Sequence, residues 1–128
     1  YNLIPVLSVY ENIVLPVELD GRKIDKDFLD DVLDILSLKE KIFNLPNTLS
    51  GGQQQRVAIA RAIISKPAVI LADEPTGNLD SKTSGDVIKL LRTVNQRFEQ
   101  TLIMITHNLE IAQLSDRIIN IIDGKVDI

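Results

Sequence analysis

KPAVILADEPTGNLDSKTSGDVIKLLRTVNQRFEQTLIMITH, residues 66–107, holds two short apolar runs on either side of a helical pattern. AVILAD and TLIMIT have the length and composition of buried strands, whereas Ser81 to Phe98 has the apolar spacing of a helix. A strand, a helix and a second strand in this order predict two parallel strands joined by a right-handed crossover. This stretch therefore predicts an α/β fold.

The residues after His107 continue the same alternation. We expect a short helix over Asn108 to Leu114 and a third strand in RIINII, residues 117–122. Asp123-Gly124 predicts a hairpin turn into a last strand from Lys125 to Ile128. The expected result is a mostly parallel sheet flanked by helices.

The N-terminal half of the chain favours helices. A short helix is expected around Val9 to Leu15, where the following proline ends it. Asp25 is a suitable N-cap for an amphipathic helix, and Ser50 for another helix that runs toward the next proline. We therefore expect a helical subdomain over residues 1–66 and half of an α/β core over residues 67–128.

The composition sets limits on what the chain can do. Hydrophobic residues make up 45% of the 128 residues, which is enough for a core in one domain or in a piece of a larger one. The formal net charge of -4 argues against a broad attraction to nucleic acid or anionic lipid. There are no cysteines, and no apolar run approaches the roughly 18 residues that span a bilayer.

Two acids follow directly on the first predicted strand, at the sheet edge where ligands of α/β folds bind. Asp73 is a candidate Mg²⁺ ligand, because magnesium prefers oxygen ligands and keeps part of its water shell. Glu74 could orient or deprotonate a water for attack on a γ-phosphate. The alternative is that the two acids only end a strand and begin a turn with Pro75.

Ser50, Gly51, Gly52 and Gln53 stand at a helix start, where unpaired N–H groups and the helix dipole can bind an anion. The alternative is an ordinary N-cap followed by flexible glycines. Two glycines in a first helical turn cost about 1 kcal/mol each relative to alanine. Some other interaction should compensate for that cost.

His107 is the only histidine, and it follows the second strand at the same edge of the sheet. A lone histidine is more often structural or solvent-facing than catalytic, although this location favours a functional role. Asn78, Leu79 and Asp80 follow the two acids in a tight loop. Alone, these three residues predict a cap for the next helix.

A glycine-rich phosphate loop, G-x-x-x-x-G-K-[ST], is missing from the 128 residues. The nearest imitation is GNLDSKT, Gly77 to Thr83, which lacks the second glycine and is one residue too short. It also places Asp80 where a phosphate would have to lie. We therefore reject it as a phosphate cradle.

Together these motifs resemble those of the nucleotide-binding subunit of ABC transporters. LSGGQQQRVAIARA, Leu49 to Ala62, is similar to the family's signature motif, and AVILADE to its Walker B motif. GNLD is similar to the D-loop, and ITH, which ends at His107, to the switch histidine. YNLIPVLSVYENIVLPVEL further resembles the subfamily of lipoprotein release and macrolide efflux. The resemblance covers nearly the whole chain and implies part of a P-loop NTPase fold.

The resemblance implies ATP and Mg²⁺ as cofactors. Asp73 would bind Mg²⁺ through water, Glu74 would be the general base, and His107 would contact the γ-phosphate and the attacking water. A second copy of the subunit would pair head to tail with the first and hold ATP against the signature residues Ser50, Gly51, Gly52 and Gln53. The D-loop would cross the dimer interface with Asn78, Leu79 and Asp80.

The resemblance also implies an ATPase that couples hydrolysis to export across the membrane or extraction from it. Its partner would be a transmembrane permease, and it would lie in the cytoplasm on the inner face of the cell membrane. The phosphate loop, the aromatic residue that stacks on adenine and the Q-loop glutamine would all lie upstream of Tyr1. The 128 residues alone are therefore expected to hydrolyse ATP negligibly.

Two alternatives stay open. An ABC-type ATPase of DNA repair or chromosome structure would carry a long coiled coil before the signature, whereas residues 1–48 are short and the acidic balance disfavours a nucleic-acid partner. A non-enzymatic module, in which the helical half only docks on the permease, belongs to a different class and is compatible with the main reading.

Overall fold

Three helices form the N-terminal half of the computed structural model, which describes residues 1–127. The predicted N-caps are confirmed, because the Asp25 side chain accepts a hydrogen bond from Phe28 N and the Ser50 side chain accepts one from Gln53 N. The helices and two short 3-10 turns are α1 (Val9–Leu19), α2 (Lys26–Ile35), η1 (Lys39–Lys41), η2 (Pro46–Thr48) and α3 (Gly51–Ile63).

Helix α1 is longer than the sequence predicts, because it continues through Pro16 to Leu19. A proline inside a helix removes one backbone hydrogen bond and normally bends or ends the helix. Val14 and Val17, on either side of Pro16, are both buried in the core. Burial of these side chains offsets the lost hydrogen bond, so the predicted end at Leu15 is wrong.

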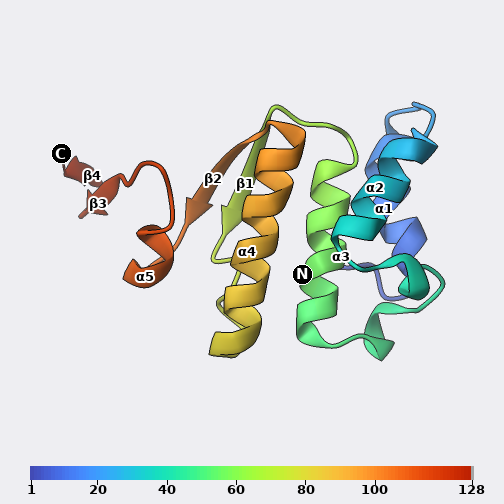
Figure 1. Cartoon of the computed structure of the whole chain (residues 1–128), viewed down its shortest axis with the longest axis horizontal. Coiled ribbons are helices and arrows are strands. Elements are labelled where there is room, and N and C mark those ends of the chain that lie inside the picture. The colour runs from blue at the N-terminus through green and yellow to red at the C-terminus, as the bar shows by residue number, and fades with distance from the viewer. Residues whose placement is uncertain (128) are drawn as a thin grey trace.

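The predicted strand, helix and strand are confirmed as β1 (Val69–Asp73), α4 (Ser81–Phe98) and β2 (Thr101–Ile105). The two strands pair in parallel, with Val69 opposite Thr101 and Asp73 opposite Ile105. The carboxyl ends of both strands lie at the same end of the molecule as the starts of α3 and α4 (Figure 1). This shared end collects the residues that the sequence singled out.

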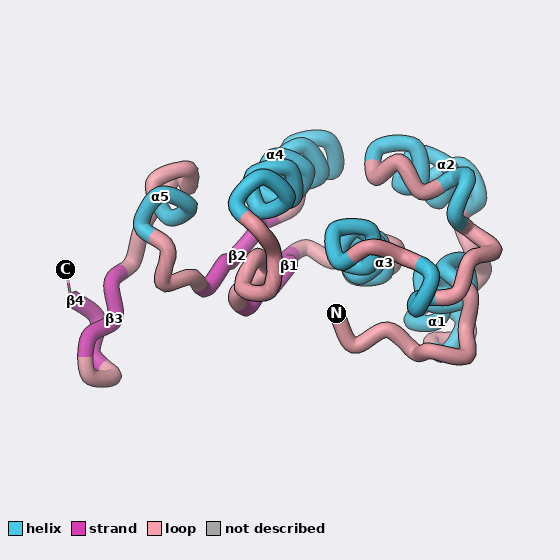
Figure 2. Tube along the Cα trace, turned by 90° about the horizontal axis from the view of Figure 1, so that it is seen from below, coloured by secondary structure: helices cyan, strands magenta, loops and turns pink. Residues whose placement is uncertain are grey.

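The sheet is covered on one face, where α4 packs, as the end-on view shows (Figure 2). Ile70 is buried, and Leu102 and Met104 pack against the core. On the opposite face, Leu71 is 77% and Ile105 is 61% exposed. The expectation that both strands are buried throughout is therefore wrong for this face, although their apolar sequence is that of strands covered on both sides.

The C-terminal part forms the short helix α5 (Leu109–Ala112) and a hairpin of β3 (Asn120–Ile122) and β4 (Lys125–Asp127). The predicted turn at Asp123-Gly124 is confirmed, with φ of 50° and 74°. β3 pairs antiparallel with β4 in a sheet separate from β1 and β2, so the expected third parallel strand is wrong. Ile128, which we expected in the last strand, lies outside the described residues.

One hydrophobic core joins α1, α2, α3 and α4, with single contributions from β1 and α5. The largest fully buried side chains include Ile13, Leu36, Leu38 and Ile63. The core thus rests mainly on the helices and reaches the sheet through one face. Across residues 1–127, no helix has the length and hydropathy needed to cross a membrane.

Candidate functional site

A carboxylate and an imidazole meet where the two parallel strands end. The Nδ1 atom of His107 lies 2.7 Å from Oε1 of Glu74, and the backbone N–H of His107 donates to the same oxygen at 3.1 Å. Glu74 follows β1 and His107 follows β2 by two residues, so the parallel register brings them together. The predicted placement of both at one sheet edge is confirmed.

The backbone of Glu74 is left-handed, with φ of 44°. This conformation is uncommon for a residue with a side chain, and residues held in it cluster at functional sites. Two hydrogen bonds hold it: Glu74 N donates to Ile105 O at 2.9 Å, and Gly77 N donates to Glu74 O at 3.0 Å. The turn aims the carboxylate at β2 and at His107.

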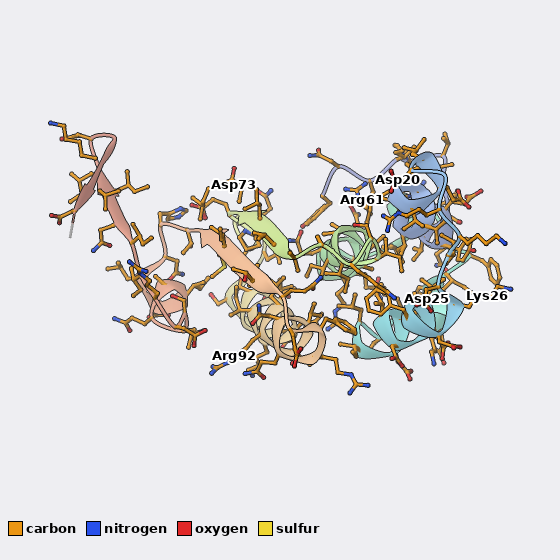
Figure 3. The ribbon with its side chains drawn as sticks, turned by 90° about the horizontal axis from the view of Figure 1, so that it is seen from above. Asp20, Asp25, Lys26, Arg61, Asp73 and Arg92 are labelled. Carbon is orange, nitrogen blue, oxygen red and sulfur yellow. The ribbon has the colours of Figure 1, made fainter. Side chains whose placement is uncertain are left out.

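Asp73 ends β1 and is exposed (Figure 3). Among residues 1–127, no three His, Cys, Asp or Glu side chains come close enough to hold a metal ion. Mg²⁺ is commonly held by one or two carboxylates together with waters and substrate phosphates. A single exposed carboxylate such as Asp73 has the ligand chemistry of such a site.

The start of α3 is a capping box built from the predicted signature residues. Ser50 Oγ accepts from Gln53 N at 3.2 Å, and the Gln53 side chain accepts from Ser50 N at 2.9 Å. The capping alternative is thus part of the structure, in which Ser50 is exposed and Gly51, Gly52 and Gln53 are half-buried. An anion at this end would meet the positive end of the helix dipole.

The two glycines at the start of α3 allow a close approach of other segments. A Cβ atom at Gly52 would lie 2.7 Å from Cγ2 of Thr83, and one at Gly51 would lie 3.0 Å from Oη of Tyr1. Glycine at position 52 therefore has a packing reason that does not depend on a phosphate, whereas the Tyr1 hydroxyl near Gly51 is the end of a flexible side chain. The close approach of Thr83 accounts for one of the two glycines in this first helical turn.

The loop of Asn78, Leu79 and Asp80 leads into α4. Asp80 is its N-cap: Oδ1 accepts from Lys82 N at 3.1 Å and from Thr83 N at 3.0 Å. Its Oδ2 accepts from the Thr83 hydroxyl at 2.6 Å, and these bonds, the Thr83 hydroxyl first among them, lower the pKa of Asp80. The predicted cap is confirmed for Asp80.

Two hollows flank the turn at Glu74. The first, of about 360 Å³, is lined by Asp73 and Asn78 and by the N-terminal residues Tyr1 and Asn2. The second, of about 350 Å³, is lined by His107 and by the first two turns of α4. Glu74, Gly77 and Leu79 line both hollows, so the turn after β1 is the wall between them.

Two residues were missed in the sequence, Arg61 in the last turn of α3 and Thr83 in the first turn of α4. Arg61 of α3 donates from Nη1 to Asn2 O at 2.9 Å and from Nη2 to Tyr1 O at 3.0 Å, which ties the N-terminal segment to α3 (Figure 3). Thr83 joins Asp80 to the start of α3. Thr83 lies three residues after the N-cap Asp80, and this is the position from whose backbone N–H an N-cap side chain commonly accepts a hydrogen bond. No local pattern identifies the partners of Arg61.

The sequence model of the ABC transporter family matches residues 1–77. The chain is 43% identical over 127 residues to lipoprotein-releasing system ATP-binding protein LolD 1 of Chlorobium chlorochromatii, covering 97% of this chain and 52% of that protein. It is 46% identical over 129 residues to cell division ATP-binding protein FtsE of Streptococcus pneumoniae, covering 98% and 56%. The chain spans about half the length of these curated relatives.

The fold is similar to solved structures of an ATP-binding cassette, MJ0796, a name that a Methanocaldococcus jannaschii relative also carries. The structure described as a dimeric post-hydrolysis state bound to ADP and Pi matches with a TM-score of 0.78 and 40% identity. The match covers 98% of this chain and 57% of that chain. This likeness confirms the expected α/β fold of the P-loop NTPase class.

Proposed function

Because this chain belongs to the ABC transporter family of ATP-binding proteins, we propose that it forms part of a subunit that hydrolyses ATP and couples hydrolysis to transport. The observation that carries the proposal is the 2.7 Å contact between Glu74 and His107 at the ends of β1 and β2. A carboxylate and an imidazole placed together at a parallel sheet edge suit the positioning of a water for phosphoryl transfer.

Three residues act on the subunit's own nucleotide in this proposal. Asp73 would hold Mg²⁺ that binds with ATP, and its exposed position at the strand end supports this role. The ion would neutralise charge that develops on the phosphates. Glu74 orients the attacking water and takes its proton, while His107 fixes the carboxylate at Oε1 and contacts the γ-phosphate.

The signature residues act on the nucleotide of a second copy. The start of α3, whose N-cap Ser50 is exposed, supports this role, because helix N-termini bind phosphate through backbone N–H groups and the dipole. We place Asn78, Leu79 and Asp80 in the interface between the copies. A similar cassette is described as dimeric, which supports a paired arrangement. The residues proposed to contact the γ-phosphate are Ser50, Gly51 and Gly52, and Gln53 supports that contact.

The partner in this proposal is a transmembrane permease, and the subunit acts on the inner face of the cell membrane in export or extraction. Residues 1–66 form the helical subdomain that docks on the permease, and residues 67–128 belong to the ATPase core. The permease selects the transported substrate. Relatives named for lipoprotein release support the transporter class without identifying the substrate of this protein.

The 128 residues alone hydrolyse ATP negligibly, because they contain no G-x-x-x-x-G-K-[ST] loop. Such a loop supplies the strongest phosphate contacts through its backbone and its lysine. Isothermal titration of Mg-ATP into the purified 128-residue chain tests this part of the proposal. Micromolar binding would contradict it.

Glu74→Gln in an ATPase subunit that contains this sequence tests the role of Glu74. The amide keeps the size of the side chain but cannot accept a proton, so hydrolysis falls by about 10²–10⁴-fold while Mg-ATP still binds. Glu99→Gln is the matched control, because Glu99 is exposed, has a left-handed backbone like Glu74 and lies at the other end of α4. A Glu74→Gln protein that hydrolyses ATP at the unaltered rate would refute the assignment.

A further inference from the structure

Thr83, in the first turn of α4, lies between the D-loop acid and the signature glycines. Its hydroxyl donates to Asp80 Oδ2 at 2.6 Å, and its backbone N–H donates to Asp80 Oδ1 at 3.0 Å. Its methyl carbon Cγ2 lies 2.7 Å from the position that a Cβ atom would take at Gly52. The two branches of one side chain therefore contact two different segments.

A second contact runs beside the first. Cδ2 of Leu79 lies 3.4 Å from the position of a Cβ atom at Gly51. Two successive glycines of α3 thus face two residues of the segment from Leu79 to Thr83. The helices α3 and α4 start at the same end of the molecule and pack against each other (Figure 1).

We propose that Thr83 is a positioning residue that fixes the signature glycines relative to the loop of Asn78, Leu79 and Asp80. The two segments then meet the second copy of the subunit as one rigid surface. That this surface meets a second copy rests on the proposed function. The joint, by which we mean the contacts of Thr83 with Asp80 and Gly52, does not depend on a bound nucleotide.

The joint requires threonine because the hydroxyl group of this side chain bonds Asp80 and its methyl group packs against Gly52. Threonine is stiff at χ1, so the bond of its hydroxyl to Asp80 also sets the direction of its methyl group. Serine keeps the donor but has no methyl group against Gly52. Valine keeps a methyl group but cannot donate to Asp80. Thr83→Ser therefore removes the contact with Gly52 and keeps the hydrogen bond to Asp80, whereas Thr83→Val removes that hydrogen bond and keeps a methyl group against Gly52.

The first test compares Gly52→Ala in two backgrounds of the 128-residue chain by urea denaturation. Alanine is favoured over glycine by about 1 kcal/mol in a helix, so without the joint this change would raise the urea midpoint. We expect Gly52→Ala to lower the midpoint when Thr83 is present and to raise it in the Thr83→Ser background. Gly85→Ala is the matched control, because a Cβ there meets nothing within 4 Å, and it raises the midpoint in both backgrounds.

The second test uses Thr83→Val, which leaves both glycines in place. We expect the amide resonances of Gly51 and Gly52 to shift together with those of Asn78 and Leu79, and Gly85→Ala to shift neither group. Shifts confined to residues 80–84, or a higher urea midpoint for Gly52→Ala with Thr83 present, would overturn the inference. Neither measurement involves ATP, so either can fail while the Glu74→Gln test of the proposed function succeeds.

Discussion

The imidazole of His107 and the carboxylate of Glu74 meet at 2.7 Å although 33 positions separate them in the chain. The contact depends on the parallel register of β1 and β2 and on the left-handed turn at Glu74. Both features belong to the backbone. The pairing of the two side chains therefore follows from the strand register and the turn.

Replacing His107 by alanine separates the function of the pair from its effect on stability. The His107 side chain is 84% exposed, so its loss changes the free energy of unfolding by less than about 0.5 kcal/mol. Hydrolysis by an intact ATPase subunit is expected to fall by about tenfold or more, since Glu74 loses the group that orients it. Urea denaturation and a steady-state assay measure the two effects, with the exposed Gln96→Ala as control. A loss of stability large enough to unfold the protein and so account for the lost hydrolysis would contradict a direct role of His107 in orienting Glu74.

The left-handed backbone at Glu74 predicts that glycine is more stable than alanine at this position. Residues with a Cβ lose roughly 1–2 kcal/mol in this conformation, and glycine does not. Glu74→Gly is therefore expected to be more stable than Glu74→Ala by about 1 kcal/mol, opposite to the order in a helix. Glu99 has φ of 51° at the end of α4, and the same pair of changes there provides the comparison. Equal urea midpoints for the two Glu74 variants would rule out backbone strain.

Ser50 has a capping role and a proposed phosphate-binding role, and two substitutions separate them. Ser50→Ala loses the cap, which costs about 1 kcal/mol of stability. Ser50→Asp keeps a good cap but places a negative charge where the γ-phosphate would bind. We expect stability near that of the unaltered protein and loss of ATP-dependent dimerisation, measured by light scattering on an ATPase subunit that contains this sequence. Dimerisation that survives Ser50→Asp would remove Ser50 from the proposed interface.

The stability of the chain should fall in acid partly through Asp25. The Lys66 ammonium at 2.6 Å, together with the backbone N–H of Phe28, lowers the pKa of Asp25 below its ordinary value. A carboxyl whose pKa is lower in the folded state stabilises the protein above its unfolded pKa of about 4, and that contribution is lost as the pH falls further.

Asp25→Asn tests this pH dependence, because asparagine keeps the N-cap without the charge. Urea midpoints measured from neutral to acidic pH should fall less steeply for the variant than for the unaltered chain. Both side chains are about half exposed, so 1 M NaCl should weaken the difference. Identical pH profiles for the two chains would show that the ion pair does not contribute.

Arg61→Lys should release the N-terminal segment from α3. The guanidinium donates to two successive carbonyl groups with the fixed fork of arginine, which the single ammonium of lysine cannot reproduce. The nuclear Overhauser contacts between the ring of Tyr1 and Gly51 are therefore expected to disappear, with a loss of about 1 kcal/mol in stability. Arg92→Lys, an exposed change on α4, is the control. If the contacts between Tyr1 and Gly51 persist in Arg61→Lys, the hydrogen bonds of Arg61 do not hold Tyr1 in place.

The helices and the edge of the sheet could be predicted because their signals are local. Ser81 to Phe98 combines an acidic cap with regular apolar spacing, and the structure places α4 over the same residues. Asp73, Glu74 and His107 follow strand-like runs, and parallel pairing then brings them to one edge. For these features, periodicity and strand polarity were sufficient.

The remaining features depend on contacts between distant segments. Pro16 lies inside α1 because Val17 is buried against other helices, which no local pattern indicates. The sequence correctly predicted the local hairpin turn at Asp123-Gly124, but not that β3 lies in a sheet separate from β1 and β2, since joining that sheet would need contacts with distant strands. The contacts of Gly52 with Thr83 and of Arg61 with Asn2 join positions far apart in the chain. Sequence spacing alone carries no information about such pairs.

The close approach of Gly52 and Thr83 also constrains how this protein can evolve. A lineage that replaces Gly52 by alanine first passes through a chain in which the methyl group of Thr83 has no room. If serine replaces Thr83 first, the same alanine becomes acceptable to the helix. We therefore expect the two positions to be epistatic, so that the order of the substitutions decides which path stays open.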